Sequence, residues 1–329
     1  MIKSKWRLAL IIIIIFFTIL FLASRGQVYD KNELEYGVTF SKKQAVGLGL
    51  DWQKVYLAVL DELGVKRLRL AAYWNEVEPV DGDYFWSDLD WQIKEAGARK
   101  AEIILALGGR LPRWPECHWP AWAAAMDKEK REQEILNYIQ ETIERYKSNS
   151  QVTTWQIENE PFLAHFGDCP KLDKEFLDKE IALARKLDSR PIAITDSGEL
   201  SIWIPAAKRA DIFGTTMYRD TYSQHLKMYI HYPIGPGFFR LKKKITSFFA
   251  HPKKWIVIEL AAEPWTKKYL KDSTQEERDR TMNPKKFKEI LEFARQTGFK
   301  EFYLWGAEWW YWEREQGRST IWEEAKKLF

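Results

Sequence analysis

The chain has 329 residues, of which 46% are hydrophobic and 30% are charged, and its formal net charge is +4. This composition excludes a disordered or collagen-like chain and is sufficient for one large hydrophobic core. Lys and Arg are interleaved with Asp and Glu, so the charge pattern does not indicate a nucleic-acid-binding surface. We therefore expect one sizeable globular domain and no nucleic-acid partner.

The N-terminus carries a separate signal. Lys3, Lys5 and Arg7 precede an apolar run over residues 8–23, which is interrupted only by Thr18. A run of about 16 residues is near the lower limit for crossing a bilayer, and a basic flank favours the cytoplasmic side. No small-residue cleavage site and no lipobox cysteine follow the run, so an uncleaved anchor is favoured over a removed signal peptide.

This signal divides the chain into three parts. Residues 1–24 are the expected cytoplasmic tip and membrane anchor, residues 25–32 a linker, and residues 33–329 the folded domain. The protein is then expected to be a single-pass protein of the cell membrane, with the lipid bilayer as partner of its anchor and the folded domain on the extracytoplasmic side.

Outside the cytoplasm, the only two cysteines can form a disulfide. Cys117 lies in RWPECHWP and Cys169 in FGDCPK, and both segments contain Pro and have the character of loops. The alternative is two free thiols, or cysteines packed as small apolar side chains. A Cys-His metal site with His118 and His165 is not favoured, because no C-x-x-C or H-x-x-x-H spacing supports it.

Beyond residue 32, short apolar runs alternate with amphipathic stretches. The strand-like runs are residues 34–40, 65–74, 101–109, 152–159, 191–197, 211–218, 254–260 and 301–310. The helix-like stretches include residues 51–64, 130–147, 173–188 and 283–298. Eight alternating strands predict a closed (β/α)8 TIM barrel. A doubly wound open sheet is the alternative, but no glycine-rich phosphate loop follows the first strand.

Two predicted strands end in glutamates. In a TIM barrel, the carboxyl ends of the strands and the loops that follow them build the active site. The fourth strand runs into WQIENEPF, which puts Glu160 at this rim, and the seventh ends at Glu259, with Glu263 just beyond it. Strands four and seven face each other across the barrel. Two carboxylates so placed suit glycoside hydrolysis, in which one protonates the leaving oxygen and the other attacks the anomeric carbon.

The sequence resembles the clan A glycoside hydrolases and is nearest in pattern to family 5, the cellulase-like enzymes. This resemblance rests on the Asn-Glu-Pro of residues 159–161, on Glu259, and on Arg69 in RLRLAAYW. The stretches WQIENE and NEVEPVDGDYFWSDLDW are similar to family 42 β-galactosidases. The resemblance implies a retaining β-glycosidase that acts on an oligosaccharide or polysaccharide without a metal or organic cofactor.

The resemblance also implies a role for each residue near the pair. Glu160 would be the acid/base, with its pKa raised by the charge of the nucleophile, Glu259. Arg69 and the Tyr218 hydroxyl would both contact Glu259. Asn159 would bind the sugar 2-hydroxyl, which requires a break in the strand pleat, because strand neighbours otherwise point to opposite faces.

Tryptophans near strand ends are further candidates for contacts with sugar. Trp305 would form the floor of the sugar site, since an indole ring packs against the C–H groups of a pyranose. Trp74 and Trp265 are candidates for lining further subsites, as are Trp114 and Trp309. Packing in the core is the alternative for each of them.

Several alternatives stay open. Glu263 is the alternative nucleophile, although it lies past the apolar run. Glu158, Glu76 and Glu78 are expected to be structural partners. The basic stretch at residues 237–254 is expected to be an ordinary barrel helix, with contact to an anionic membrane as the alternative. For the whole protein, the alternative function is a catalytically inactive barrel that binds glycans.

Overall fold

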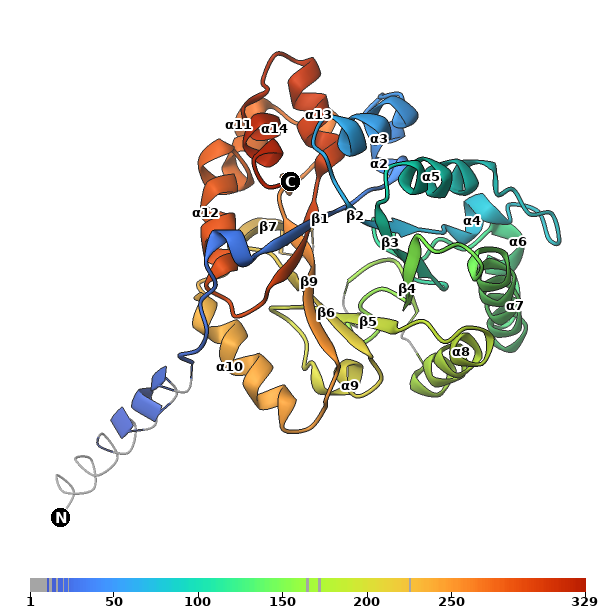
Figure 1. Cartoon of the computed structure of the whole chain (residues 1–329), viewed down its shortest axis with the longest axis horizontal. Helices are drawn as coiled ribbons and strands as arrows, with labels where there is room; N and C mark the ends of the chain where they lie inside the picture. Colours follow the sequence, from blue (N-terminus) through green and yellow to red (C-terminus); the bar gives the residue numbers. More distant parts are fainter. Residues whose placement is uncertain are drawn as a thin grey trace.

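The computed structural model describes residues 24–163, 166–170, 173–224 and 226–329, and parts of the N-terminal segment between residues 11 and 22. Eight parallel strands within these ranges close into a barrel, so the predicted (β/α)8 fold is confirmed (Figure 1). Around the barrel the strands are β1 (Glu35–Thr39), β2 (Arg67–Ala71), β3 (Glu102–Leu107), β4 (Val152–Ile157), β5 (Ile192–Asp196), β6 (Ile212–Met217), β9 (Lys254–Ala261) and β10 (Glu301–Trp305).

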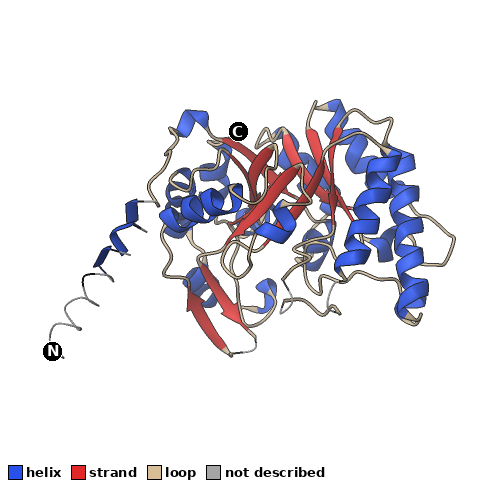
Figure 2. Ribbon diagram, turned by 90° about the horizontal axis from the view of Figure 1, so that it is seen from below, coloured by secondary structure: helices blue, strands red, loops and turns tan. Residues whose placement is uncertain are grey.

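Helices surround the barrel in Figures 1 and 2. The longer ones are α3 (Trp52–Asp61), α5 (Ser87–Ala98), α7 (Lys128–Tyr146), α8 (Lys174–Leu187), α10 (Pro236–Ser247), α12 (Pro284–Arg295) and α13 (Ala307–Glu315). Shorter ones are η1 (Lys31–Glu33), α2 (Lys42–Gly47), α4 (Trp74–Val77), α6 (Ala121–Ala124), α9 (Ile204–Ala207), η2 (Leu270–Asp272), α11 (Gln275–Thr281) and α14 (Thr320–Lys326).

Local sequence explains where α12 begins. Asn283 is its N-cap, and its side chain accepts hydrogen bonds from the backbone N–H groups of Lys285 and Lys286. Pro284 occupies the first turn, where its missing N–H costs nothing. This is the start that the sequence predicts.

The strands read as apolar runs because both of their faces are buried. Ile104, Ile256, Ile258 and Tyr303 form a buried cluster of their own. They come from β3, β9 and β10, and β3 is not a neighbour of the other two in the sheet. Their contact therefore crosses the inside of the barrel, which is filled by side chains.

Two elements differ from the prediction. The strands β7 (Asp220–Ser223) and β8 (Met228–His231) form an antiparallel hairpin after β6, which projects from one end of the barrel (Figure 2). Their short sequences lack a long apolar alternation. The expected last strand, residues 301–310, ends at Trp305, because Gly306 adopts a φ of 124° and α13 begins at the next residue.

The N-terminal segment is only partly described. Residues 1–10, 12, 13, 16, 20 and 23, which belong to the expected anchor, lie outside the described residues. Within the described part of the chain, no helix has both the length and the apolar character needed to cross a membrane. The expected linker contacts the domain, because the Tyr29 N–H donates to the Arg295 carbonyl over 3.3 Å.

Candidate active site

The backbone turns away from the strand conformation where β4 ends. Glu158 and Glu160 adopt φ values of 59° and 43°, which are uncommon for residues that carry a Cβ. This is the expected break in the pleat. The Glu158 carboxylate stabilises the turn by accepting the backbone N–H groups of Gly109 and Arg110, over 2.7 and 2.6 Å. It therefore has the structural role that the sequence suggests, and it fixes the loop after β3 to the end of β4.

Glu259 lies in β9 with only 3% of its surface exposed. Its Oε1 accepts a hydrogen bond from Arg69 Nη1 over 2.6 Å, and its Oε2 accepts one from the Tyr218 hydroxyl over 2.7 Å. Arg69 is fully buried, and its other nitrogens donate to Gln156 Oε1 over 2.8 Å and to Asn159 Oδ1 over 2.6 Å. Both oxygens of Glu259 are thus held in fixed positions by strong hydrogen bonds.

Glu160 is 5% exposed and has a different environment. Its Oε1 accepts a hydrogen bond from the Thr216 hydroxyl over 3.2 Å, and its backbone N–H donates to Thr195 Oγ1 over 2.8 Å. Burial, and then the negative charges of Glu259 and Glu116, raise the pKa of Glu160 well above its usual range. Thr216 pairs with Glu259 in the β6–β9 ladder, so its hydroxyl brings Glu160 close to that strand.

Glu116 is a further buried carboxyl group at the site, which sequence reasoning missed. Its Oε2 accepts a hydrogen bond from Asn159 Nδ2 over 2.9 Å and lies 3.7 Å from Arg110 Nε. Burial raises its pKa to about 8, despite the nearby Arg110. Together with Arg69 on the Oδ1 atom, Glu116 fixes the orientation of the Asn159 amide. No periodic pattern in the sequence marks this loop residue.

Cys117 and Cys169 form a disulfide across a sequence separation of 52 residues. The bond joins the loop after β3 to the loop after β4. A second contact lies beside it, because the Asp168 N–H donates to the Pro115 carbonyl over 2.9 Å. Glu116 lies between Pro115 and Cys117, so these two links hold it in place beside Asn159.

A metal site has no support in the described residues. His118 Nε2 lies 2.9 Å from the Arg113 carbonyl, and its ring packs against Tyr73. His165 lies outside the described residues. No group of three or more His, Cys, Asp or Glu side chains in the described part of the chain is arranged to hold a metal ion.

Glu263 belongs to a separate cluster of buried charges. Its Oε1 accepts hydrogen bonds from Arg113 Nη1 and, over 2.8 Å, from Trp305 Nε1. Arg113 Nη2 also lies 3.2 Å from Glu308 Oε2, and burial raises the pKa of Glu308 to about 7. The Arg113 guanidinium carbon lies 3.9 Å from the centroid of the Trp305 ring. One face of Trp305 is therefore covered by a cation, and its role as the floor of the sugar site stays a prediction for the other face.

The other tryptophans differ in their surroundings. Trp74 is fully buried against Trp122 and Tyr138, and it donates to Glu78 Oε2 over 2.8 Å. Its expected role in lining a subsite is therefore wrong, because α4 turns it into the core. Trp309 is also buried. By contrast, Trp114 is exposed.

Trp265 lies next to the carboxylate pair. Its ring packs edge-on against Tyr218, with 5.4 Å between centroids, and it also contacts Phe166. Since Tyr218 donates to Glu259, Trp265 supports a residue of the site and is partly exposed beside it. This position is compatible with a contact to substrate.

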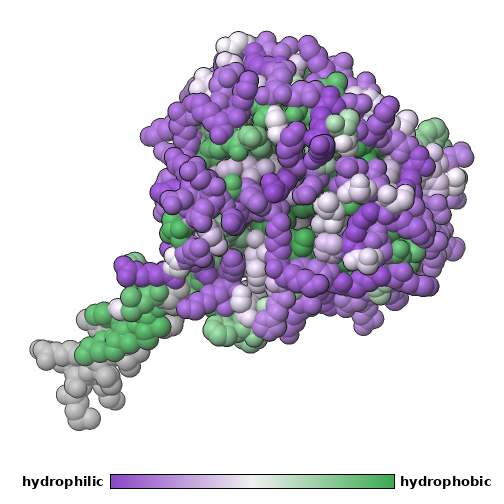
Figure 3. All heavy atoms as spheres, viewed as in Figure 1, coloured by the Kyte–Doolittle hydropathy of each residue, from purple (hydrophilic) through white to green (hydrophobic). Residues whose placement is uncertain are grey.

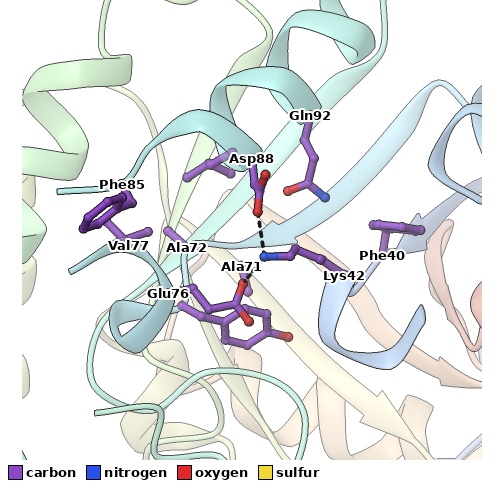
Figure 4. Close-up of a pocket in the computed structure, with 11 residues that line it drawn as sticks. Phe40, Lys42, Ala71, Ala72, Glu76, Val77, Phe85, Asp88 and Gln92 are labelled. Atoms are coloured by element: carbon purple, nitrogen blue, oxygen red, sulfur yellow. Dashed lines mark hydrogen bonds and ion pairs between the residues drawn. The ribbon is translucent and has the colours of Figure 1, made fainter. Parts of the chain in front are cut away.

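Neither of two cavities in the domain is lined by Glu160 or Glu259. A pocket beside α4 and α5 holds about 40 Å³, which is enough for a few water molecules and too small for a sugar ring. Figure 4 shows that Lys42 reaches across it to Glu76 and Asp88, over 3.1 and 2.6 Å. A larger cavity of about 340 Å³ lies between the β7–β8 hairpin and α12 and reaches Glu263 at one edge.

The fold of the chain is similar to those of solved glycoside hydrolases. No family model matches the chain. Solved structures with a similar fold include an exo-β-1,4-mannosidase from Opitutaceae bacterium strain TAV5, with a TM-score of 0.54 and 16% identity over 83% of this chain and 51% of that one. A family 10 endo-β-1,4-xylanase from Gloeophyllum trabeum has a TM-score of 0.56 and 12% identity over 83% of both chains. The chain has the fold of the clan A glycoside hydrolases.

One curated relative is similar in sequence. β-Galactosidase BgaA from Clostridium cellulovorans is 26% identical over 174 residues. The match covers 46% of this chain and 26% of the relative. The chain thus spans about a quarter of that β-galactosidase and about half of the mannosidase that shares its clan A fold.

Proposed function

We propose that the protein is a retaining β-glycoside hydrolase, with Glu160 as acid/base and Glu259 as nucleophile. The observation that carries this proposal is the contrast between the two buried carboxyl groups. Both oxygens of Glu259 are held by donors, whereas burial and neighbouring charge raise the pKa of Glu160. One group is thus suited to attack and the other to donate a proton.

The first step forms a covalent intermediate. A Glu259 oxygen attacks the anomeric carbon, the glycosidic C–O bond breaks, and Glu160 transfers its proton to the leaving oxygen. Asn159 Nδ2 carries two hydrogens, and Glu116 accepts one of them. The other has no partner among the described residues and can donate to the sugar 2-hydroxyl, as the resemblance implies.

The second step releases the sugar. When Glu259 becomes an ester, its negative charge is lost, so the pKa of Glu160 falls and its carboxylate can accept a proton from water. That water attacks the anomeric carbon, the ester bond breaks, and Glu259 is regenerated. Two inversions leave the product with the β configuration.

The substrate class is an oligosaccharide or polysaccharide outside the cytoplasm. The fold neighbours include enzymes named for xylan, mannose and galactose linkages, which supports a glycan in general. Residues 1–24 would anchor the domain to the cell membrane.

Trapping the intermediate tests the mechanism. An activated 2-deoxy-2-fluoro β-glycoside should inactivate the protein and leave one sugar on Glu259, detected by peptide mass mapping. For an aryl β-glycoside that the protein cleaves, NMR during the hydrolysis should detect the β-anomer of the sugar as the first product. An adduct on Glu263, or an α-anomer as first product, would overturn the assignment.

A glycan-binding barrel without activity is the second candidate. It is compatible with the low exposure of Glu160, Glu259 and Trp305, which restricts the access of a substrate to the carboxylate pair. In that case calorimetry would detect glycan binding, while a panel of aryl β-glycosides and of β-glucan and mannan polymers would give no product.

A further inference from the structure

The outward side of α10 carries an apolar stripe that the rest of the domain does not cover. Its members are Phe238, Ile245, Phe248 and Phe249, with exposures of 36%, 44%, 72% and 56%. Positions 238 and 245 are seven residues apart, which places them on one side of α10, and Phe248 and Phe249 follow directly after its last residue, Ser247. Phe239 and Thr246 occupy the buried side. The outer side of a barrel helix is usually polar, so this stripe needs a partner.

The same region is strongly basic. Residues 235–255 contain no Asp or Glu, and they include Arg240, Lys242, Lys243, Lys244, Lys253 and Lys254. Lys244 adjoins Ile245 in the sequence, Lys253 follows Phe249 by four residues, and both are exposed. Exposed aromatic and aliphatic side chains flanked by lysines are typical of helices that lie on membranes with anionic headgroups.

The N-terminal segment meets the domain at this helix. Arg240 Nε donates to the Ser24 carbonyl over 2.7 Å, and a Cβ placed on Gly237 would lie 3.0 Å from Ser24 Oγ. The described residues of the preceding segment include exposed Ile14, Phe17 and Phe21. Figure 3 shows apolar surface along this segment and at the lower edge of the domain, over the end of α10. Both apolar features therefore lie on the α10 side of the barrel.

We propose that this α10 face, formed by the apolar stripe with Lys244 and Lys253, is a binding surface for a lipid bilayer that contains anionic headgroups. The apolar side chains would enter the interface between headgroups and acyl chains, while the lysines would contact the headgroups. The proposal does not depend on the glycosidase activity. Because α10 runs along the side of the barrel, this contact holds the barrel axis close to the membrane plane. The active-site end of the barrel then faces along the membrane surface.

Site-specific fluorescence on the full chain tests this surface. A Ser247→Cys variant is labelled with an environment-sensitive dye, while the native cysteines stay in their disulfide. A matched label at Lys94→Cys lies on α5, across the barrel from α10 in Figure 1. The protein is reconstituted in vesicles of phosphatidylcholine, with or without phosphatidylglycerol, that carry a spin-labelled lipid quencher. Quenching at position 247 should exceed that at position 94 by at least about fivefold in the anionic vesicles, and should be weaker in the neutral ones.

Variants separate the two parts of the surface. Replacing both Phe248 and Phe249 with Ser should remove the excess quenching, whereas Phe85→Ser, an exposed aromatic elsewhere, should not. Replacing Lys244 and Lys253 with Glu should remove it in anionic vesicles. Hydrolysis of a soluble aryl glycoside should stay unchanged in all these variants.

Three outcomes would overturn the proposal. The first is equal quenching at positions 247 and 94, and the second is quenching that is the same in neutral and anionic vesicles. The third is a spectral shift at position 247 that appears without lipid and grows with protein concentration, which would identify a second copy of the chain as the partner. A catalytically inactive protein that still shows the excess quenching would leave this proposal intact and refute only the enzymatic one.

Discussion

Arg69 and Glu259 form an ion pair inside the barrel, with 2.6 Å between Nη1 and Oε1. Removing one partner of a buried pair leaves an uncompensated charge, at a cost of about 3–5 kcal/mol. We therefore expect Arg69→Met to lower the free energy of unfolding by about that amount, as measured by urea denaturation. Arg67→Met is the matched control, because Arg67 in the same strand pairs with Glu35 near the surface. It should cost less than about 1 kcal/mol. Equal losses would contradict this account.

Replacing Glu259 and replacing Glu160 should reduce the activity in different ways. Glu259→Ala should abolish turnover of every substrate, since no glycosyl-enzyme can form. Glu160→Ala should slow substrates with poor leaving groups most, because an activated aryl group needs little protonation. Added azide should then restore turnover and give a β-glycosyl azide, identified by NMR. Near-normal activity of Glu259→Ala would direct attention to Glu263.

The Tyr218 hydroxyl offers a milder test of the nucleophile's environment. A hydrogen bond to a charged group contributes about 1.5–3 kcal/mol, so Tyr218→Phe should lower kcat by about 10- to 100-fold. KM should change little, because the contact orients Glu259 and does not hold the substrate. Tyr222→Phe, in the β7–β8 hairpin, is the control in the same assay. A change confined to KM would place Tyr218 in substrate binding.

Glu116 should make stability depend on pH. Its pKa is raised from 4.5 to about 8, mainly by burial, so the folded protein binds this proton more tightly than the unfolded chain. The stabilising contribution is complete below about pH 4.5 and is lost as the pH rises through 8. One such group lowers the free energy of unfolding by up to about 1.4 kcal/mol per pH unit in this window.

The variant Glu116→Gln tests that dependence. Urea denaturation should be measured at several pH values between about pH 5 and pH 8. The free energy of unfolding should fall less steeply with pH in the variant than in the natural protein. Glu102→Gln changes an exposed carboxylate at the start of β3 and should leave the slope unaltered. Parallel curves for Glu116→Gln and the natural protein would refute the assignment.

The disulfide should contribute to stability and to the site. In the chain-entropy model, closing a loop of this length contributes about 4 kcal/mol, and measured effects are often smaller. Reduction, or Cys117→Ser, should lower the free energy of unfolding by up to that amount, as measured by urea denaturation. It should also slow catalysis, because Glu116 is no longer held beside Asn159. Non-reducing peptide mapping of protein made in an oxidising compartment should recover the linked peptides. Two free thiols there would contradict the prediction.

The barrel could be predicted from the sequence because its strands are buried on both faces. Runs such as the one before Glu259 are apolar throughout, so a charged residue at their end is conspicuous. The contacts of Glu259 with Arg69 and Tyr218 were expected from the resemblance, and the structure contains both. Their catalytic roles stay predictions.

Other features depend on tertiary structure that no local pattern encodes. Glu116 reaches Asn159, 43 residues away in the chain, through a loop in which Arg113 and Glu116 both adopt positive φ. Trp74 follows a strand end as predicted, but a four-residue helix directs it inward. The contact of the Arg113 guanidinium with the Trp305 ring joins residues that are far apart in the sequence. The local sequence around either residue therefore could not predict it.

The Cys117–Cys169 bond also determines what a broken backbone would do to this protein. A cut between residues 118 and 168 leaves Glu116 on the N-terminal fragment. Glu160 lies on the C-terminal fragment when the cut precedes residue 160, and on the N-terminal fragment when the cut follows it. A nick in the turn between α7 and β4 would separate the two carboxyl groups onto different fragments. The fragments would nevertheless stay covalently joined until a reductant is added. The nicked protein should therefore migrate as one species on a non-reducing gel, with both halves of the site still paired.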